Sequence, residues 1–170
     1  SLFDKLITKA PLSSSLGRIL DALSCYLGIC CKRTYDGEPA MKLERYLAQG
    51  KPHIAFDLSN FDSTLNTSEL FLYLHEHVSR LKRPLSEKEK ADLACSFVRS
   101  LAQWFAQRAV SYANDYDVSS VGLTGGVSYN IPLLEMIQAQ VEASDLRFLV
   151  HSRIPNGDGG IATGQNVIVF

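Results

Sequence analysis

A chain of 170 residues, 46% of them hydrophobic, is long enough to bury one sizeable core. The 17 basic and 18 acidic residues give a net charge of −1 and form no basic block that could follow a phosphate backbone, so nucleic acid is an unfavoured partner. No apolar run approaches the roughly 20 residues of a membrane span. The cysteines form no Cys-x-x-Cys pair, which fits a reduced, cytoplasmic compartment.

The first part of the chain is predicted to be mainly helical. Apolar residues recur at helical spacing over 16–27, between a serine run and Gly28. A second helix is expected to start at Asp36 or Gly37 and to stop at Gly50. The stretch HIAFDL, residues 53–58, alternates in part and is predicted to be a strand that leads into a polar loop.

Two longer helices are expected in the middle of the chain. Thr67 opens the first, in which leucines and a valine line one face. Ser86 and Glu89 form a capping-box pattern, in which each side chain bonds the other's backbone N–H, before the longest helix. The two helices are expected to pack antiparallel.

The last third changes pattern to strand, helix, strand and short closing helix. The stretches are DVSSVGL, NIPLLEMIQAQVEA, LRFLVHS and GIATGQNVIVF. A strand, helix, strand succession favours a parallel pair of strands covered by helices. The predicted fold class is therefore α/β, helix-rich with a small mixed sheet, in one compact unit.

Gly125 and Gly126 lie where a strand gives way to a helix, and Asn130 stands at or near the cap of that helix. Glycines remove side-chain bulk, so a ligand or a second backbone segment can approach closely. Free N–H groups at a helix start favour an anion. The residues alone leave open whether this is a ligand contact or a tight turn.

Asp158 precedes Gly159 and Gly160 at the start of the closing helix. Its carboxylate is suited to capping that helix and complementing its dipole. Clustered glycines also fit the close approach of a phosphate, a metal or another loop, and a carboxylate is a suitable ligand for a divalent ion. No His-Glu-x-x-His or paired-cysteine motif accompanies it, so further metal ligands must come from elsewhere.

The stretch TYDGEPAMKLE offers carboxylates around a glycine turn and a helix start. Glu38 and Glu44, with Asp36, suit the paired hydroxyls of a ribose, and the alternative is an ordinary solvated helix N-terminus. Arg18 and the serines before it could likewise face a nucleotide or serve only the local structure.

Four stretches together and in this order resemble the C-terminal part of the HypF family, the carbamoyltransferases of nickel–iron hydrogenase maturation. They are SSSLGRILDALSCYLG, TYDGEPAMKLE, LTGGVSYN and HSRIPNGDGGIATGQ. The likeness runs over nearly the whole chain. The same region is similar to the TsaD family of tRNA threonylcarbamoyl transferases and to the actin-like ATPase (ASKHA) superfamily. The resemblance implies that residues 1–170 are one subdomain of that fold and a fragment of a longer multidomain protein.

The resemblance also implies a reaction. Carbamoyl phosphate and ATP are made into carbamoyl-adenylate in an adjacent YrdC-like domain, and the carbamoyl group passes to the C-terminal cysteine thiol of HypE, for cyanide ligand synthesis. The isolated fragment is expected to be inactive. Its partners would be HypE and the remaining domains of the parent chain, or a second copy of the fragment.

Site residues follow from the same resemblance. The nucleotide-binding positions are Gly37, Glu38, Glu44, Gly125, Gly126 and Asn130. Asp158 matches a metal-ligand aspartate, and histidines outside the fragment complete that divalent metal site. Thr124 stands where the family commonly has serine, and Ser128 with Tyr129 replaces a commoner Phe-Gln, which puts side-chain contacts of this turn in question.

Other functions stay open on the sequence alone. One is a tRNA threonylcarbamoyl transferase, against which the near-neutral charge argues. Another is an O-carbamoyltransferase that acts on a small metabolite. A third is a non-catalytic nucleotide-binding or docking module, for which nucleotide affinity without turnover would be the sign.

Overall fold

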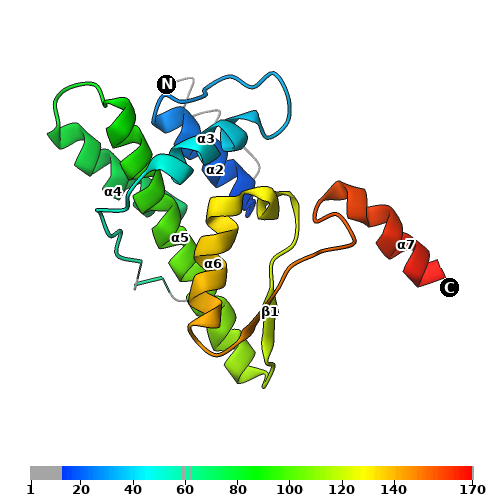
Figure 1. Ribbon diagram of the computed structural model, residues 1–170. Helices are drawn as coiled ribbons and strands as arrows, with labels where there is room; N and C mark the ends of the chain where they lie inside the picture. Colours follow the sequence, from blue (N-terminus) through cyan, green and yellow to red (C-terminus); the bar gives the residue numbers. More distant parts are fainter. Residues whose placement is uncertain (1–12, 59, 62, 170) are drawn as a thin grey trace.

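The computed structural model describes residues 13–58, 60–61 and 63–169 (Figure 1). Its elements follow the predicted order closely. They are α2 (Leu16–Tyr26), α3 (Glu38–Gln49), α4 (Thr67–Arg80), α5 (Glu87–Asp115), β1 (Ser120–Gly122), η1 (Gly126–Tyr129), α6 (Ile131–Glu142), β2 (Arg147–Leu149), η2 (Asp158–Gly160) and α7 (Ile161–Val169). None of the helices described is long and apolar enough to cross a membrane.

Helix α5 is the centre of the fold. It packs against α3 and α6, while α2 packs against α3 (Figure 1). Phe97 is fully buried on α5, and its ring lies 5.6 Å from that of Phe56 and 5.1 Å from that of Phe71 on α4. One side chain of α5 thus joins two other segments of the core.

The helix boundaries arise from the capping residues that the sequence indicated. The capping box of Ser86 and Glu89 is present at the start of α5. Gly37 begins α3 with a φ of 79°, which favours glycine. Gly50 ends α3 where a Cβ would lie only 2.1 Å from the carbonyl oxygen of Ala91, so only a glycine lets this segment meet α5 so closely.

The strand predicted over residues 53–58 is wrong. Among the residues that the structure describes, this segment joins no sheet, and side chains of α5 accept its N–H groups in place of a neighbouring strand. The Ser96 hydroxyl accepts from the N–H groups of His53 (3.1 Å) and Ile54 (3.3 Å). The Ser100 hydroxyl accepts from the N–H of Phe56 at 3.3 Å. One turn earlier on α5, the Asp92 carboxylate accepts from the N–H of Lys51 at 2.8 Å.

The predicted parallel pair of strands is confirmed. Val121 of β1 stands opposite Phe148 of β2, and α6 connects the two strands. The α/β class therefore holds, although within the described residues the sheet is this parallel pair rather than a mixed sheet. Parallel strands end at the same edge, so the loops that follow β1 and β2 emerge side by side. Ligands of open α/β sheets bind in this position.

Candidate functional site

Hydrogen bonds join the two strand-end loops, a name used here for residues 123–130 after β1 and 150–160 after β2. The N–H of Gly125 donates to the carbonyl of Asn156 at 2.8 Å. The N–H of Gly157 donates to the hydroxyl of Tyr129 at 3.3 Å. A Cβ at Gly157 would lie 3.7 Å from the Cα of Gly126. The sequence-predicted Gly-Gly turn and the loop of Asp158 thus form one structure.

Side chains outside the predicted set of site residues also take part in this junction. The Thr124 hydroxyl donates to the carbonyl of Asn156 at 3.4 Å and lies 3.1 Å from Nε2 of His151. The side-chain oxygen of Asn156 is enclosed and has no hydrogen-bond partner among the described residues. His151 lies near the end of a predicted strand and Asn156 just after it, and these positions were the signal that could have indicated them.

The structure requires glycine at two of the junction positions, for a different reason at each. Gly125 has a φ of 95°, a conformation that side chains strongly disfavour. Gly160 is fixed by crowding, since a Cβ there would lie 2.5 Å from the carbonyl oxygen of Pro155. Neither reason applies to Gly126, because its φ is not positive and a Cβ there would meet nothing within 4 Å. Open space at Gly126 is what the close approach of a ligand would require.

Asn130 and Glu44 meet at the start of α6. The side-chain oxygen of Asn130 accepts from the N–H of Leu133 at 3.1 Å, and the side chain is buried. Glu44 on α3 accepts from the N–H of Ile131 at 3.1 Å. A carboxylate here complements the positive end of the helix dipole. In this structure both residues cap α6, and Glu44 also ties α3 to the end of the loop after β1.

Glu38 lies almost two helical turns before Glu44, about 9 Å along the axis of α3. Its carboxylate accepts from the N–H of Thr34 (2.5 Å) and the Thr34 hydroxyl (3.0 Å), and it pairs with Lys42 at 2.7 Å. Lys42 and then Thr34 lower the pKa of Glu38 to about 2. The side chain therefore holds the loop before α3, and the structure does not bring it to the strand-end loops.

The ionised Glu38 carboxylate stabilises the folded protein, and this stabilisation depends on pH. The folded-state pKa of about 2 lies below the ordinary value of 4.5. The contribution of Glu38 to the free energy of unfolding is therefore complete above about pH 4.5, and it is lost as the pH falls toward 2. We expect Glu38→Gln to flatten the fall in the free energy of unfolding across this window, measured by denaturant titration at several pH values. The exposed Glu135→Gln controls for the loss of one charge, and parallel curves for wild type and Glu38→Gln would contradict the prediction.

Asp158 starts η2 and is exposed. A free carboxylate at this point fits a hard divalent cation as one ligand. Within the described residues, no group of three His, Cys, Asp or Glu side chains could hold a metal ion. A metal site that includes Asp158 would thus need ligands from outside this part of the chain.

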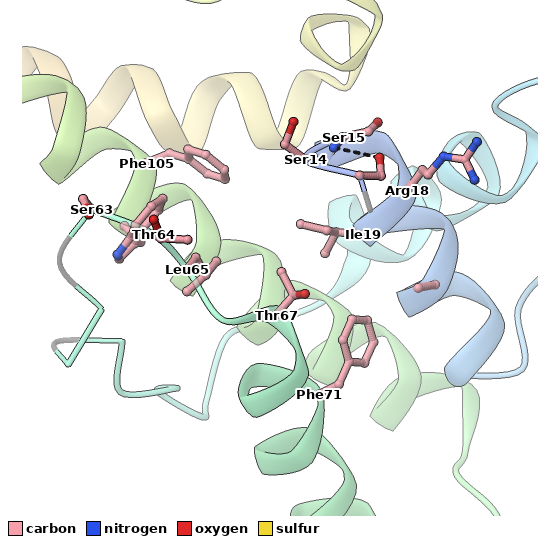
Figure 2. A pocket seen from close by; sticks show the side chains of 13 residues that line it. Ser14, Ser15, Arg18, Ile19, Ser63, Thr64, Leu65, Thr67, Phe71 and Phe105 are labelled. Carbon is pink, nitrogen blue, oxygen red and sulfur yellow. Dashed lines mark hydrogen bonds between the residues drawn. The ribbon is translucent and has the colours of Figure 1, made fainter. Parts of the chain in front are cut away.

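The cavity that Figure 2 shows lies elsewhere, beside the start of α2. It measures about 480 Å³, and Thr67, Phe71 and Phe105 are among its lining residues. Arg18 points away from Phe105 in this view, so its guanidinium does not face the middle of the cavity (Figure 2). The first turn of α2 also contacts η1, because a Cβ at Gly17 would lie 3.5 Å from the side chain of Val127.

A parallel strand pair connected by a helix, with hydrogen-bonded glycine loops at its carboxyl edge, is the arrangement of an α/β subdomain. Residues 3–165 match the family model "Carbamoyltransferase, Kae1-like Domain, second subdomain". The chain belongs to this family.

Curated relatives agree with this assignment. The probable carbamoyltransferase HypF of Methanocaldococcus jannaschii is 36% identical over 157 residues, which are 92% of this chain and 20% of that protein. The carbamoyltransferase HypF of Rhodobacter capsulatus is 35% identical over 161 residues, 94% of this chain and 20% of that protein. The chain therefore spans about a fifth of the length of these relatives.

A solved structure has the same fold. The crystal structure of T. kodakarensis HypF superposes with a TM-score of 0.83 at 35% identity, over 99% of this chain and 21% of that one. A full-length HypF in a phosphate- and nucleotide-bound form superposes with a TM-score of 0.73 at 23% identity, over 92% of this chain and 20% of that one, a likeness of fold alone.

Proposed function

We propose that this chain supplies the nucleotide-facing half of a carbamoyl transfer site in a HypF-type enzyme. The parent protein would move the carbamoyl group of carbamoyl-adenylate to the C-terminal cysteine thiol of HypE, in hydrogenase maturation in the cytoplasm. The observation that carries the proposal is the junction of the strand-end loops, where the Gly125 N–H donates to the Asn156 carbonyl and the Gly157 N–H donates to the Tyr129 hydroxyl. The carbamoyltransferase names of the relatives support the reaction class.

The chain's own groups would bind and orient the adenylate. The open side of Gly126 lets the main chain approach a phosphate or sugar, and the first N–H groups of η1 have no partner within that short helix. Asn130 and Glu44 hold the start of α6 in place beside it. Catalysis of this kind rests on positioning the electrophile against the incoming thiol.

Asp158 would hold the divalent metal together with histidines of another part of the parent. The metal would stabilise the negative charge that develops on the phosphate as AMP leaves. Because the Gly157 N–H donates to the Tyr129 hydroxyl, the backbone next to Asp158 is tied to the Gly-Gly turn. The loop after β2 would thereby position the Asp158 carboxylate toward the metal.

Removing the Asp158 carboxylate tests the proposal. The full-length parent is incubated with carbamoyl phosphate, ATP and HypE, and the mass of the C-terminal cysteine peptide of HypE is followed. We expect Asp158→Ala to slow thiol carbamoylation by about tenfold or more, with adenylate formation intact, because a metal ligand is lost.

Asp115→Ala is the matched control, an exposed aspartate at the far end of α5. It should transfer carbamoyl at the wild-type rate. Equal transfer by Asp158→Ala and wild type would leave Asp158 as a helix cap and overturn this part of the mechanism.

The tRNA-modifying alternative has weaker support. A tRNA N6-adenosine threonylcarbamoyltransferase of Thermosynechococcus vestitus is 30% identical over 125 residues, but these cover 68% of this chain. The two HypF relatives cover 92% and 94%. Modified adenosine in tRNA incubated with the parent would favour the alternative. Nucleotide binding without transfer to either acceptor would favour the docking module.

Helix α7 fits a subdomain that is covered by the rest of its parent chain. It extends away from the other helices (Figure 1), and Ile161, Val167 and Ile168 expose 56%, 74% and 86% of their surface. Exposed apolar residues of this kind promote association. Dimerisation of the isolated fragment stays a prediction on the same ground.

A further inference from the structure

The turn after α2 brings two cysteines together. Gly28, with a φ of 68°, reverses the chain, and the N–H groups of Ile29 (2.9 Å) and Cys30 (3.3 Å) both donate to the carbonyl of Ser24. The chain thus runs back over the last turn of α2. Cys31 arrives beside Cys25, with its Sγ 3.3 Å from the carbonyl oxygen of Cys25.

Both of these thiols are accessible, and a third, adjacent one is not. Cys25 and Cys31 are exposed and free, whereas Cys30 is buried. The Sγ of Cys30 lies 3.3 Å from the carbonyl of Lys32, a different acceptor from the one that Cys31 uses. Contact with the Cys31 side chain raises the pKa of the Cys25 thiol, with burial as the next cause. The Cys31 sulfur thus lies against Cys25, within 3.3 Å of its carbonyl oxygen.

We propose that Cys25 and Cys31 form a reversible disulfide, with a small-molecule disulfide such as oxidised glutathione as the oxidant. The thiolate of Cys31 attacks one sulfur of glutathione disulfide and breaks its S–S bond, which releases one glutathione thiolate. Cys25 then loses its proton and attacks the Cys31 sulfur, which forms the protein disulfide and releases the second glutathione. The two cysteines are oxidised by two electrons, glutathione disulfide is reduced, and the two protons end on the released thiols.

The geometry favours this pairing over the alternatives. Bonded sulfurs lie about 2.0 Å apart, which neighbouring exposed side chains reach by rotation about their own bonds. Cys30 and Cys31 are adjacent in sequence, where a disulfide is awkward. The ring that closes between Cys25 and Cys31 ends just before Thr34, so oxidation would stiffen the loop that Glu38 holds. The inference does not depend on the proposed function.

The experiment poises the full-length parent in glutathione buffers from fully reduced to oxidised, then quenches exchange with acid and blocks free thiols with iodoacetamide in denaturant, so that the buried Cys30 also reacts. Trypsin releases residues 19–32, which contain Cys25, Cys30 and Cys31. We expect the oxidised peptide to carry a single alkyl group, on Cys30, and an internal disulfide that lowers its mass by about 2 Da through the two hydrogens lost. Dithiothreitol should restore alkylation of all of its cysteines.

Single cysteine variants test whether the disulfide joins Cys25 to Cys31. Cys25→Ser and Cys31→Ser should each abolish the disulfide, and because both positions are exposed the protein should still fold. Cys30→Ser should retain it. Alkylation of Cys25 and Cys31 at every buffer ratio would overturn the proposal, as would stable glutathione adducts on them or a linkage to Cys30.

Discussion

Truncating Phe97 to alanine is expected to lower the free energy of unfolding by about 3–5 kcal/mol. The ring is fully buried on α5 and touches both Phe56 and Phe71, so its removal leaves a cavity where three segments meet. Neighbours on three separate elements cannot all move inward to fill that space. Denaturant unfolding of the 170-residue chain, followed by circular dichroism, measures the loss.

Leu72→Ala is the control for this truncation. Leu72 lies on α4 close to Phe71 in sequence, but 57% of its surface is exposed. Its replacement should change the free energy of unfolding by no more than about 0.5 kcal/mol. A loss of similar size in both variants would mean that Phe97 is not at the centre of the core.

The positions of the helices could be predicted because their signals are local. The apolar spacing of α2 and α5 and the capping box at Ser86 and Glu89 involve residues within one or two turns of each other. Gly37 and Gly50 mark the two ends of α3 in the same way. Such patterns depend little on the rest of the chain.

The segment 51–58, which contains the predicted strand 53–58, could not be predicted correctly. The side chains that accept its N–H groups lie about 40 residues further along the chain. Its alternating pattern is typical of a strand, but Asp92, Ser96 and Ser100 accept its N–H groups instead of a neighbouring strand. Polar residues repeated every fourth position on the buried face of α5 were the available signal. The periodicity indicates that α5 has such a polar row, but it does not identify the segment whose N–H groups the row accepts.

The candidate site was predictable in its backbone and less so in its side chains. Gly125, Gly126 and Asn130 do form the turn into α6, and Gly157 joins them to the loop of Asp158. Glu44 caps α6 across a gap of 87 residues in sequence, a contact that was not expected, while its place near a ribose stays a prediction. Contacts of this range depend on how α3 and α6 pack, which no local pattern encodes.

Gly160→Ala is expected to slow carbamoyl transfer by the parent protein about a hundredfold. The new Cβ would lie 2.5 Å from the carbonyl oxygen of Pro155, a backbone atom that moves only with its loop. Relieving this clash must reshape the turn that carries Asp158, and a displacement of about 1 Å at a reacting site costs rates of that order. The mass of the HypE cysteine peptide measures the rate, as for Asp158→Ala.

Ser144→Ala separates this effect from a general response to substitution. Ser144 is exposed just after α6, at the edge of the sheet opposite the strand-end loops, and its replacement should leave transfer unchanged. If the loop after β2 positions Asp158, Gly160→Ala should keep the wild-type rate of adenylate formation and lose only the transfer step. A wild-type transfer rate in Gly160→Ala would show that this loop can move without slowing carbamoyl transfer. The hydrogen bond that ties the loop of Asp158 to the Gly-Gly turn would then have no role in catalysis.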